Sequence, residues 1–339
     1  MSTPAATPAG RPHTMRAVVQ LGYGGPEVLR VEELPLPSAG AHDVLVRVHA
    51  AGVDRGTDHL MTGKPYVARL ALGLRLPRRP VCGRDVAGTV VEVGAGVTSL
   101  QAGDDVYGVA PGSFADYAVG PETKLVRKPA DLSFAEAAAV PISGGTALQA
   151  VVDAGRVREG QSVLVLGASG GVGSFAVQLA KAFGAEATGV CGTAKHDFVR
   201  SLGADHVLDH TRDDFADGTR QWDVILDIGG NPSLKRLRRA LQPRGTVVFV
   251  GGEGAGNVTG LGRQLRGALL SPLSRQRMVL LVSKERGRDY ERLRELIEEG
   301  SVVPRVDRSY PLEEAAEALR RLRAGEVRGK LTVTVAPAG

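Results

Sequence analysis

The sequence predicts an α/β protein made of two units, an antiparallel, barrel-like sheet followed by a parallel, doubly wound sheet. Three observations predict this class. Residues 15–136 carry short strand-like runs separated by turn signals. From Ala137 onward, apolar runs of strand length alternate with helical segments. The length of 339 residues suits two domains of roughly 150 residues each.

The first unit is predicted to consist of strands and turns. Val44, Val46 and Val48 fall on alternate positions, which is the period of a half-buried strand. Val86–Val93 is a second strand candidate, and Gly103–Asp105 is a turn signal before the next one. Short strands with this spacing are typical of an antiparallel barrel.

The second unit alternates strands with helices, which predicts a parallel sheet with right-handed crossovers. The strand candidates are Val163–Leu166, Ala187–Cys191, His206–Leu208, Val224–Asp227 and Thr246–Val250. The helix candidates are Ser174–Phe183, Lys195–Leu202, Pro232–Leu241, Tyr290–Glu299 and Pro311–Arg323. Two further extended segments are expected at Val302–Val306 and Leu331–Val335.

A glycine-rich turn follows the first of these strands. Residues 163–173 read V-L-V-L-G-A-S-G-G-V-G, and an apolar segment that can continue as a helix comes next. Gly170 and Gly173 fill the second and third glycine places of G-x-G-x-x-G, while Ala168 replaces the first. Such a turn is also found as a plain loop in α/β proteins, but the flanking strand and helix favour a dinucleotide-phosphate site. The predicted contacts are Ala168, Ser169, Gly170, Gly171, Val172 and Gly173.

The balance of charge bears on the partners of the protein. Lys and Arg number 42 against 37 Asp and Glu, which gives a net charge of +5 and a pI near 9.3. Local densities at Lys235–Arg239 and Arg320–Arg323 lie on predicted helices with solvated faces. Aromatic residues make up 4% of the chain, too few for base-stacking platforms. We therefore expect no nucleic-acid partner, and the mild positive charge suits an anionic cofactor.

Targeting and redox signals are few. No run of about 18 apolar residues occurs, so no membrane partner is expected. Residues 1–14 lack an apolar core and are expected to form a disordered tail rather than a signal peptide. The two cysteines, Cys82 and Cys191, exclude a disulfide framework and a four-cysteine zinc site. The expected location is the cytoplasm.

Several short motifs lie at intervals along the chain: residues 50–54 (A-A-G-V-D), 83–88 (G-R-D-V-A-G), 103–106 (G-D-D-V), 138–147 (A-A-V-P-I-S-G-G-T-A), 202–205 (L-G-A-D) and 329–330 (G-K). Together with the glycine turn, these motifs resemble the zinc-independent, quinone oxidoreductase-like branch of the medium-chain dehydrogenase/reductase superfamily. The resemblance covers about residues 15–336.

The resemblance implies two domains. A GroES-like β-barrel catalytic domain is expected at residues 15–137, completed by residues 303–339, and a Rossmann dinucleotide-binding domain at residues 138–302. It also implies a small-molecule substrate in the cleft between the domains. A homodimer is expected, paired through the sheet edge at Met278–Val282.

The positions that bind zinc in the zinc-dependent relatives carry other residues in this chain. Those relatives have a cysteine at the place of Asp54, and Gly-His-Glu at the place of Gly83–Asp85. The guanidinium of Arg84 cannot ligate a metal. Asp54, His59 and Asp85 lack the spacing of three ligands around an open position. No metal is therefore expected. Asp54 and Asp85 are interpreted as hydrogen-bonding or ion-pairing residues, and a purely structural role stays open for Asp85 together with Arg84.

The cofactor implied by the resemblance is a nicotinamide dinucleotide, and the sequence favours NADPH. An NAD site usually carries an acid about 20 residues past the glycine turn, but the strand end at residues 190–195 (V-C-G-T-A-K) has no acid before Asp197. Thr193 and Lys195 suit a 2′-phosphate, which a carboxylate would repel. Lys195 also fits the start of an exposed helix. His210 is a weaker candidate, at a position where relatives often carry a tyrosine.

The resemblance further implies hydride transfer to an acceptor that is already activated. Without a Lewis-acid metal, a quinone or an α,β-unsaturated carbonyl fits best, because conjugation spreads the developing charge. We therefore expect an NADPH-dependent, metal-independent reductase of quinone or enone and enoyl substrates. Two alternatives stay open: a non-catalytic NADPH-binding protein of the same fold, and a metal-independent carbonyl or alcohol reductase.

The remaining site residues match positions of the family. Tyr66 matches an active-site tyrosine, or it forms an apolar wall of the cleft. Asp54 either orients the ribose of the cofactor or braces its own loop. Thr146 and the pair Gly251 and Gly252 match residues beside the nicotinamide ring and its carboxamide. Lys330 either reaches the cofactor or lies at the surface.

Overall fold

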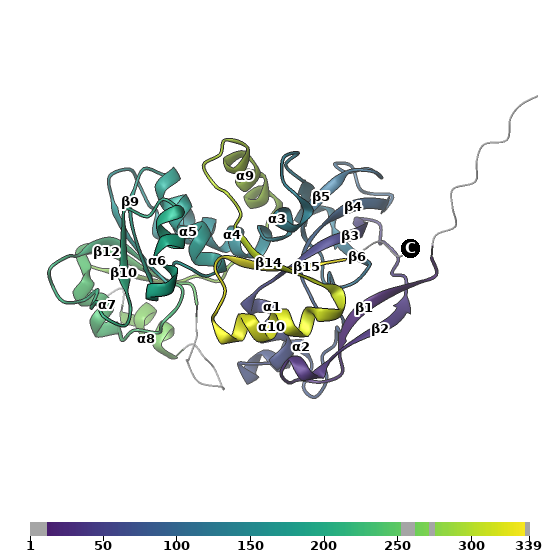
Figure 1. Ribbon diagram of the computed structural model, residues 1–339, viewed down its shortest axis with the longest axis horizontal. Helices are drawn as coiled ribbons and strands as arrows, with labels where there is room; N and C mark the ends of the chain where they lie inside the picture. The colour runs from purple at the N-terminus through teal and green to yellow at the C-terminus, as the bar shows by residue number, and fades with distance from the viewer. Residues whose placement is uncertain (1–11, 252–261, 271–274, 336–339) are drawn as a thin grey trace, which may run out of the picture.

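The computed structural model describes residues 12–251, 262–270 and 275–335 (Figure 1). Its later half contains a six-stranded sheet in which every pair of neighbouring strands is parallel, as the alternating pattern predicted. The strand order is β10 (His206–Asp209), β9 (Glu186–Cys191), β8 (Ser162–Leu166), β11 (Trp222–Asp227), β12 (Leu241–Phe249) and β13 (Arg277–Leu280). The chain runs outward from β8 in both directions, so the carboxyl end of β8 is a topological switch point, the usual place for a ligand.

Helices connect or follow these strands. They are α5 (Gly171–Ala182), α6 (His196–Ser201), α7 (Leu234–Ala240), α8 (Gly262–Leu270) and α9 (Gly287–Glu298), with short helical segments at Gln149–Gly155 (η4) and Thr193–Lys195 (η5). Strand β13 ends the strand order, so the segment expected to pair two subunits begins at a sheet edge. Pairing through that edge stays a prediction.

The other sheet has seven strands and draws on both ends of the chain. Its order is β14 (Val306–Pro311), β15 (Lys330–Thr334), β3 (Asp43–Val53), β4 (Asp85–Val93), β5 (Asp105–Val109) and β7 (Leu125–Arg127), with β6 (Tyr117–Pro121) paired to β3. Strand β15 is antiparallel to β3, with Leu331 opposite Val53. A separate hairpin joins β1 (Thr14–Gln20) and β2 (Leu29–Pro35). The strand pairings of the described ranges form an open path and show no closed barrel.

The expectation that residues 15–136 contain only strands and turns was wrong. Helices α1 (Arg55–Thr62), α2 (Arg69–Leu72) and α3 (Phe134–Ala138) interrupt the strands, and α4 (Pro141–Leu148) follows them. Each of two helix starts has a side-chain cap: Asp54 accepts from the amide of Thr57, and Ser133 forms a capping box with Glu136. Three short 3₁₀ segments also lie in this part of the chain, at Pro26–Val28, Tyr66–Ala68 and Glu122–Lys124.

The C-terminal helix begins later than its sequence pattern predicted. Pro311 is the last residue of β14, a 3₁₀ segment follows at Leu312–Glu314, and α10 runs from Ala315 to Ala324. Gly325 ends the helix in the left-handed conformation, with φ of 71°. This segment returns the chain to β15, beside the long strand β3 (Figure 1).

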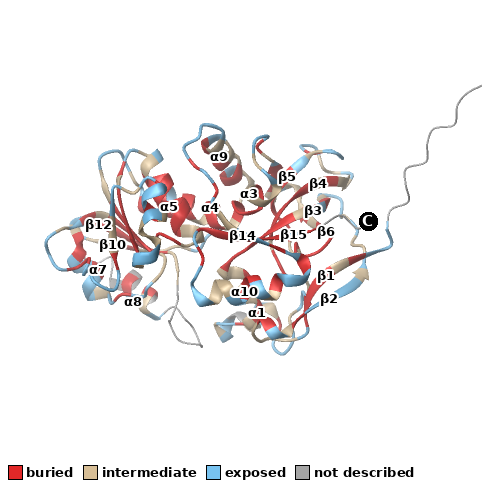
Figure 2. Cartoon of the chain, viewed as in Figure 1, coloured by how far each residue is buried: buried red, intermediate tan, exposed pale blue. Residues whose placement is uncertain are grey.

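One hydrophobic core spans both sheets, as the buried residues in Figure 2 indicate. It contains Ala87 and Tyr107 from the seven-stranded sheet together with Val163 and Val165 from the parallel sheet. The hydroxyl of Tyr107, fully buried on β5, donates to the carbonyl oxygen of Tyr290 on α9 at 2.6 Å. The two sheets are therefore joined by packing as well as by the chain.

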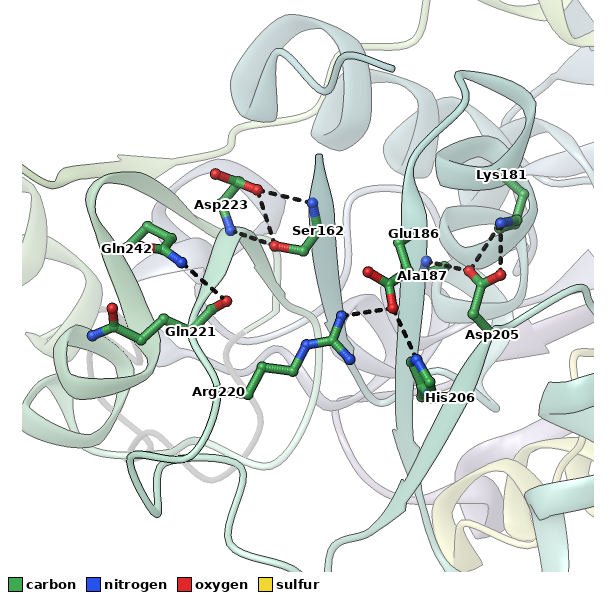
Figure 3. Close-up of polar contacts among 10 residues, drawn as sticks. All are labelled: Ser162, Lys181, Glu186, Ala187, Asp205, His206, Arg220, Gln221, Asp223 and Gln242. Atoms are coloured by element: carbon green, nitrogen blue, oxygen red, sulfur yellow. Dashed lines mark hydrogen bonds and ion pairs between the residues drawn. The ribbon is translucent and has the colours of Figure 1, made fainter. Parts of the chain in front are cut away.

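Polar side chains secure the amino ends of the parallel strands (Figure 3). The amide and hydroxyl of Ser162 both donate to Asp223 at 2.9 Å, which links the starts of β8 and β11. Asp205 accepts from the amide of Ala187 at 2.7 Å and from Lys181 at 2.8 Å. These contacts stabilise the end of the sheet opposite the glycine turn. None of the helices in the described part of the chain is long and apolar enough to span a membrane.

Candidate cofactor and substrate site

The glycine-rich turn lies at the carboxyl end of β8. Gly167 has a φ of +84°, and the amides of Gly167 and Ala168 both donate to the carbonyl oxygen of Val190 at 3.1 Å. A Cβ at Gly173 would lie 2.1 Å from the carbonyl oxygen of Gly167, so only glycine allows this close helix–strand packing. Gly170 is the N-cap of α5 and has no side chain with which to cap it. The first amides of α5 are thus available for an anion, as a dinucleotide cradle requires.

The C-terminal segment covers this turn. The amide of Gly329 donates to the carbonyl oxygen of Ser169 at 2.9 Å. A Cβ at Gly171 would lie 3.0 Å from Cδ of Lys330 and 3.0 Å from Oγ of Ser143. The predicted contacts in the turn therefore lie between the start of α4 and the start of β15.

Lys330 is buried, so the alternative of a surface lysine is wrong. Its side chain is 2% exposed, and its Nζ lies 3.2 Å from Oδ2 of Asp85, which is fully buried. The other oxygen of Asp85 accepts from the amide of Ile142 at 2.8 Å. Burial raises the pKa of Asp85 to about 7 against the opposing attraction of Lys330. Asp85 is therefore an ion-pairing residue, as predicted, and its partner is Lys330.

Asp54 caps α1 and has one unsatisfied oxygen. Its Oδ1 accepts from the amide of Thr57 at 2.7 Å, so the side chain does brace its own loop. Asp54 is 6% exposed, and its Oδ2 is buried without a hydrogen-bond partner among the described residues. The negative charge of Asp54 also raises the pKa of Asp85. An orphaned, buried carboxylate oxygen is a place where a ligand hydroxyl would be stabilised.

Tyr66 lies at the surface. Tyr66 is 44% exposed, and the guanidinium of Arg69 lies 4.8 Å from the centroid of its ring. Arg69 also lies 4.3 Å from the ring of Tyr23. The role of Tyr66 stays a prediction.

The end of β9 and the start of α6 form the expected adenosine end of the site. The hydroxyl of Thr193 donates to Asp209, which is the last residue of β10 and also accepts from Thr211. These hydrogen bonds lower the pKa of Asp209, so its carboxylate is ionised. The side chain of His210 is exposed, and a Cβ added at Gly192 would lie 3.6 Å from its Nε2. Thr193 and His210 therefore lie together, with a carboxylate beside them that was not expected there.

Lys195 is bound within the chain rather than exposed. Its Nζ donates to the carbonyl oxygens of Gly325 and Val327, at 2.6 and 2.9 Å. Burial lowers the pKa of Lys195. The exposed Arg328, on the segment that leads into β15, donates to the carbonyl oxygen of Ala194, the neighbour of Lys195, at 3.0 Å. Lys195 and Arg328 therefore lie close to the turn that was predicted to hold a 2′-phosphate, and Arg328 is a cation that sequence reasoning did not single out.

A cavity of about 70 Å³ lies between α4, α9 and the segment after β13. Thr146 contributes to its wall, in keeping with a place beside the nicotinamide. The lining residues are Arg84, Pro141, Ile142, Gly145, Thr146, Ser283, Lys284, Glu285 and Tyr290. Gly251 follows the end of β12, and a Cβ there would lie 2.1 Å from the carbonyl oxygen of Ile228. Gly252 lies outside the described residues.

Arg84 forms an ion pair across this cavity. Its guanidinium contacts Oε1 of Glu285, whose Oε2 lies 2.6 Å from Nζ of Lys124. One carboxylate therefore serves two cations. Glu285 follows β13, and no local pattern in the sequence connects it with Arg84 or Lys124. The ion pair of Arg84 was not predicted from the sequence.

The chain is similar to known oxidoreductases over most of its length. Residues 40–130 match the family described as "Alcohol dehydrogenase GroES-like domain", and residues 202–333 match "Zinc-binding dehydrogenase". The chain is 31% identical over 94% of its length to the "Chloroplast envelope quinone oxidoreductase homolog" of Arabidopsis thaliana, of which it covers 98%. It is 33% identical over 96% of its length to "2-methylene-furan-3-one reductase" of Solanum lycopersicum, of which it covers 80%. The quinone oxidoreductase structure from Coxiella burnetii superposes with a TM-score of 0.84 at 29% identity, covering 95% of this chain and all of that one.

One of these family descriptions implies zinc, and the residues present do not fit that ion. In the described ranges, no group of three or more His, Cys, Asp and Glu side chains is arranged to hold a metal. Arg84 stands where the zinc-dependent relatives have a histidine ligand, and a guanidinium has no lone pair to offer. Asp54 stands where they have a cysteine, and one of its oxygens is used as a helix cap. The described residues at these positions therefore do not fit a catalytic zinc ion.

Proposed function

Because the chain belongs to the quinone oxidoreductase-like branch of the medium-chain dehydrogenase/reductase superfamily, we propose that it is an NADPH-dependent, metal-independent reductase of quinones or α,β-unsaturated carbonyl compounds. The enzyme class, oxidoreductase, comes with the family. The cofactor preference and the type of acceptor are the parts that need support from the site.

The proposal rests on one observation: the structure has both a glycine turn suited to a pyrophosphate and a cavity lined by the guanidinium of Arg84. The cradle at Gly170 offers backbone amides to a pyrophosphate, and the cavity beside Thr146 contains Arg84 in place of a metal ligand. A cation that cannot ligate zinc suits an acceptor that needs only a hydrogen bond to its oxygen. When bound, the nicotinamide supplies the hydride.

NADPH is favoured over NADH by the groups at the end of β9. Lys195 lies on the turn that follows Gly192, and Arg328 donates to the carbonyl oxygen of Ala194 on that turn. Asp209 is the opposing feature, because its carboxylate lies beside Thr193. Its oxygens accept from Thr193 and Thr211, so they are already partnered. These hydrogen bonds stabilise the charged form of the carboxylate, so Asp209 remains the feature that opposes a phosphate here.

The other site residues have roles of positioning. Lys330 and Asp85 hold the C-terminal segment against the glycine turn. The orphaned oxygen of Asp54 is suited to accept from a hydroxyl of the cofactor's ribose. Thr146 and Gly251 are suited to the nicotinamide ring and its carboxamide. Tyr66 is kept as a candidate hydrogen-bond donor near the acceptor.

The acceptor class is supported by the named relatives. The Arabidopsis relative is called a quinone oxidoreductase homolog, and the tomato relative reduces, by its name, a methylene-furanone. A methylene-furanone is a conjugated enone, so both names describe acceptors that delocalise the incoming charge.

The proposal is tested by following the absorbance of reduced nicotinamide with a panel of quinones, enones and simple aldehydes. We expect oxidation of NADPH with at least one quinone or enone, at a kcat/KM at least about tenfold above that with NADH. Tight NADPH binding without turnover of any acceptor would instead support a non-catalytic binding protein. Turnover of aldehydes but of no conjugated acceptor would support a carbonyl reductase.

The proposal extends to assembly and location. We propose a homodimer through β13, no nucleic-acid or membrane partner, and a cytoplasmic location, where the two free, buried cysteines would stay reduced. Light scattering of the purified chain tests the dimer, and cell fractionation tests the location.

A further inference from the structure

We infer that Arg84 forms an anion-binding subsite in the cavity of about 70 Å³, where its guanidinium binds the acceptor oxygen that becomes negative on hydride addition. This inference rests on the proposed function and deepens it. It assigns the electrophilic group of the site to a residue for which the sequence suggested only a structural role.

The charges around the cavity favour an anion. Arg84 and Lys284 line it, and Glu285 is the only carboxylate among the lining residues. Glu285 is shared, because Lys124 lies 2.6 Å from its second oxygen. One carboxylate thus contacts two cations, so Arg84, Lys124 and Glu285 together carry one excess positive charge.

Two other carboxylates close to the cavity are already partnered. Asp85 follows Arg84 in the chain, but its oxygens bind Lys330 and the amide of Ile142. Asp289 accepts from Nε2 of Gln149 at 2.7 Å, and Nε of Arg288 lies 3.7 Å from its Oδ1. Neither carboxylate therefore compensates the excess charge on Arg84.

The geometry of Arg84 suits this role. A guanidinium has five N–H donors, and the contact with Glu285 is made through one of its nitrogens, so further donors remain for a second oxygen. The side chain of Arg84 is 34% exposed and that of Glu285 is 17% exposed, so the charges act in a partly dehydrated setting. Electrostatic attraction is stronger there than in bulk water.

The step balances as follows for an enone. Hydride, carrying two electrons, adds to the β-carbon, the C=C π pair shifts toward the carbonyl carbon, and the C=O π pair moves onto oxygen. The resulting enolate oxygen is held by Arg84, and a proton from water at the α-carbon gives the saturated ketone. The cofactor is left oxidised.

The first test measures anion binding without any turnover, by saturation-transfer NMR with formate on the full chain. We expect Arg84→Met to weaken formate binding at least about tenfold. The matched control is Arg320→Met, which removes an arginine paired with Glu317 on α10, outside the cavity lining; it should change binding less than about twofold. Equal binding of formate by the wild type and Arg84→Met overturns the inference.

A second variant, with the opposite expected effect on formate affinity, keeps the test valid if Arg84→Met fails to fold. Glu285→Gln removes the competing carboxylate while keeping the shape of the side chain, so formate should bind at least about threefold more tightly. A merely structural ion pair predicts no gain. Unchanged or weaker binding in a folded Glu285→Gln protein also overturns the inference.

The second test separates the inference from the proposed function. With NADPH saturating and methyl vinyl ketone as acceptor, Arg84→Met should lower kcat at least about 100-fold, as for the loss of an oxyanion donor. Its Kd for NADPH should stay within about twofold of wild type. A wild type without turnover that still binds formate through Arg84 refutes the proposed function and leaves the subsite standing. Normal kcat in Arg84→Met refutes the catalytic role.

Discussion

Nζ of Lys330 lies 3.2 Å from Oδ2 of Asp85, and both side chains are buried. Lys330 begins β15 near the C-terminus, while Asp85 begins β4. The stem of Lys330 also lies against Gly171, the first residue of α5. One ion pair therefore connects the C-terminal strand, the seven-stranded sheet and the glycine turn that is proposed to hold the cofactor.

Removing this lysine should destabilise the protein strongly. Lys330→Met leaves Asp85 buried without its cation, and we expect a loss of about 3–5 kcal/mol in the free energy of unfolding. The double variant Lys330→Met with Asp85→Asn should be more stable than the single one by at least about 1 kcal/mol, because no unpaired charge is left. Denaturation in guanidinium chloride measures both. Wild-type stability in Lys330→Met would show that the pair contributes nothing.

Two glycines of the turn should respond differently to the same change. A Cβ at Gly170 meets only the carbonyl oxygen of Gly167 at 3.6 Å, and its φ of −85° suits alanine. Gly170→Ala should therefore fold normally but bind NADPH at least about tenfold more weakly, because the methyl group occupies the phosphate cradle. Titration calorimetry checks the affinity.

Gly173→Ala is the contrasting variant, since its Cβ would lie 2.1 Å from a backbone oxygen. It should lose about 1–3 kcal/mol of stability from overpacking, measured by denaturation. If Gly170→Ala binds NADPH as well as the wild type does, the cofactor does not use this turn.

Arg328 should distinguish the two nicotinamide cofactors. Arg328→Gln is expected to raise the Kd for NADPH by about tenfold or more, because a charge-assisted bond to the 2′-phosphate is lost. Its Kd for NADH should stay within about twofold. Arg320→Gln, an exposed arginine paired with Glu317 on α10, is the matched control. Parallel loss of both cofactors in Arg328→Gln would argue against a phosphate contact.

The buried Asp227 should give the stability a pH dependence. It is 1% exposed, lies 2.6 Å from Arg263, and burial raises its pKa from 3.8 to about 6. Because the folded state holds this proton more tightly than the unfolded state, stability falls as the pH rises between these values. Relative to Asp227→Asn, whose amide does not titrate, the wild type should lose about 3 kcal/mol between pH ~4 and pH ~7. Unfolding by urea across that range measures the difference, and parallel curves would refute it.

Much of the parallel sheet could be predicted because its signals are local. The strand, glycine turn and helix around Gly170 lie within about twenty adjacent residues, and hydrophobic period alone separates the strands from the helices. The helix after Asp54 has an equally local signal, an aspartate three residues before Thr57 at a helix start. The sequence analysis predicted no helix there, because Asp54 was interpreted as orienting the ribose of the cofactor or bracing its own loop.

Contacts between distant residues could not be predicted in the same way. Lys330 and Asp85 are 245 positions apart, so the burial of Lys330 depends on β15 returning beside β3. Thr193 suits a phosphate by residue type, but β10 places Asp209 against its hydroxyl. Lys195 likewise donates to carbonyl oxygens of residues 325 and 327, which only the folded chain places near it. The ion pair of Arg84 with Glu285 and the cavity beside them also depend on the folded chain, and no local pattern in the sequence indicates either.

The most direct test of the proposed function is single-turnover oxidation of NADPH by the metal-stripped protein mixed with a quinone or enone, with the metal content measured on the same sample. We predict a rate of NADPH oxidation that is unchanged by a zinc chelator, in protein that contains far less than one metal ion per chain. A rate that disappears with the chelator and returns with added zinc would contradict the account, and so would protein that oxidises no NADPH with any acceptor.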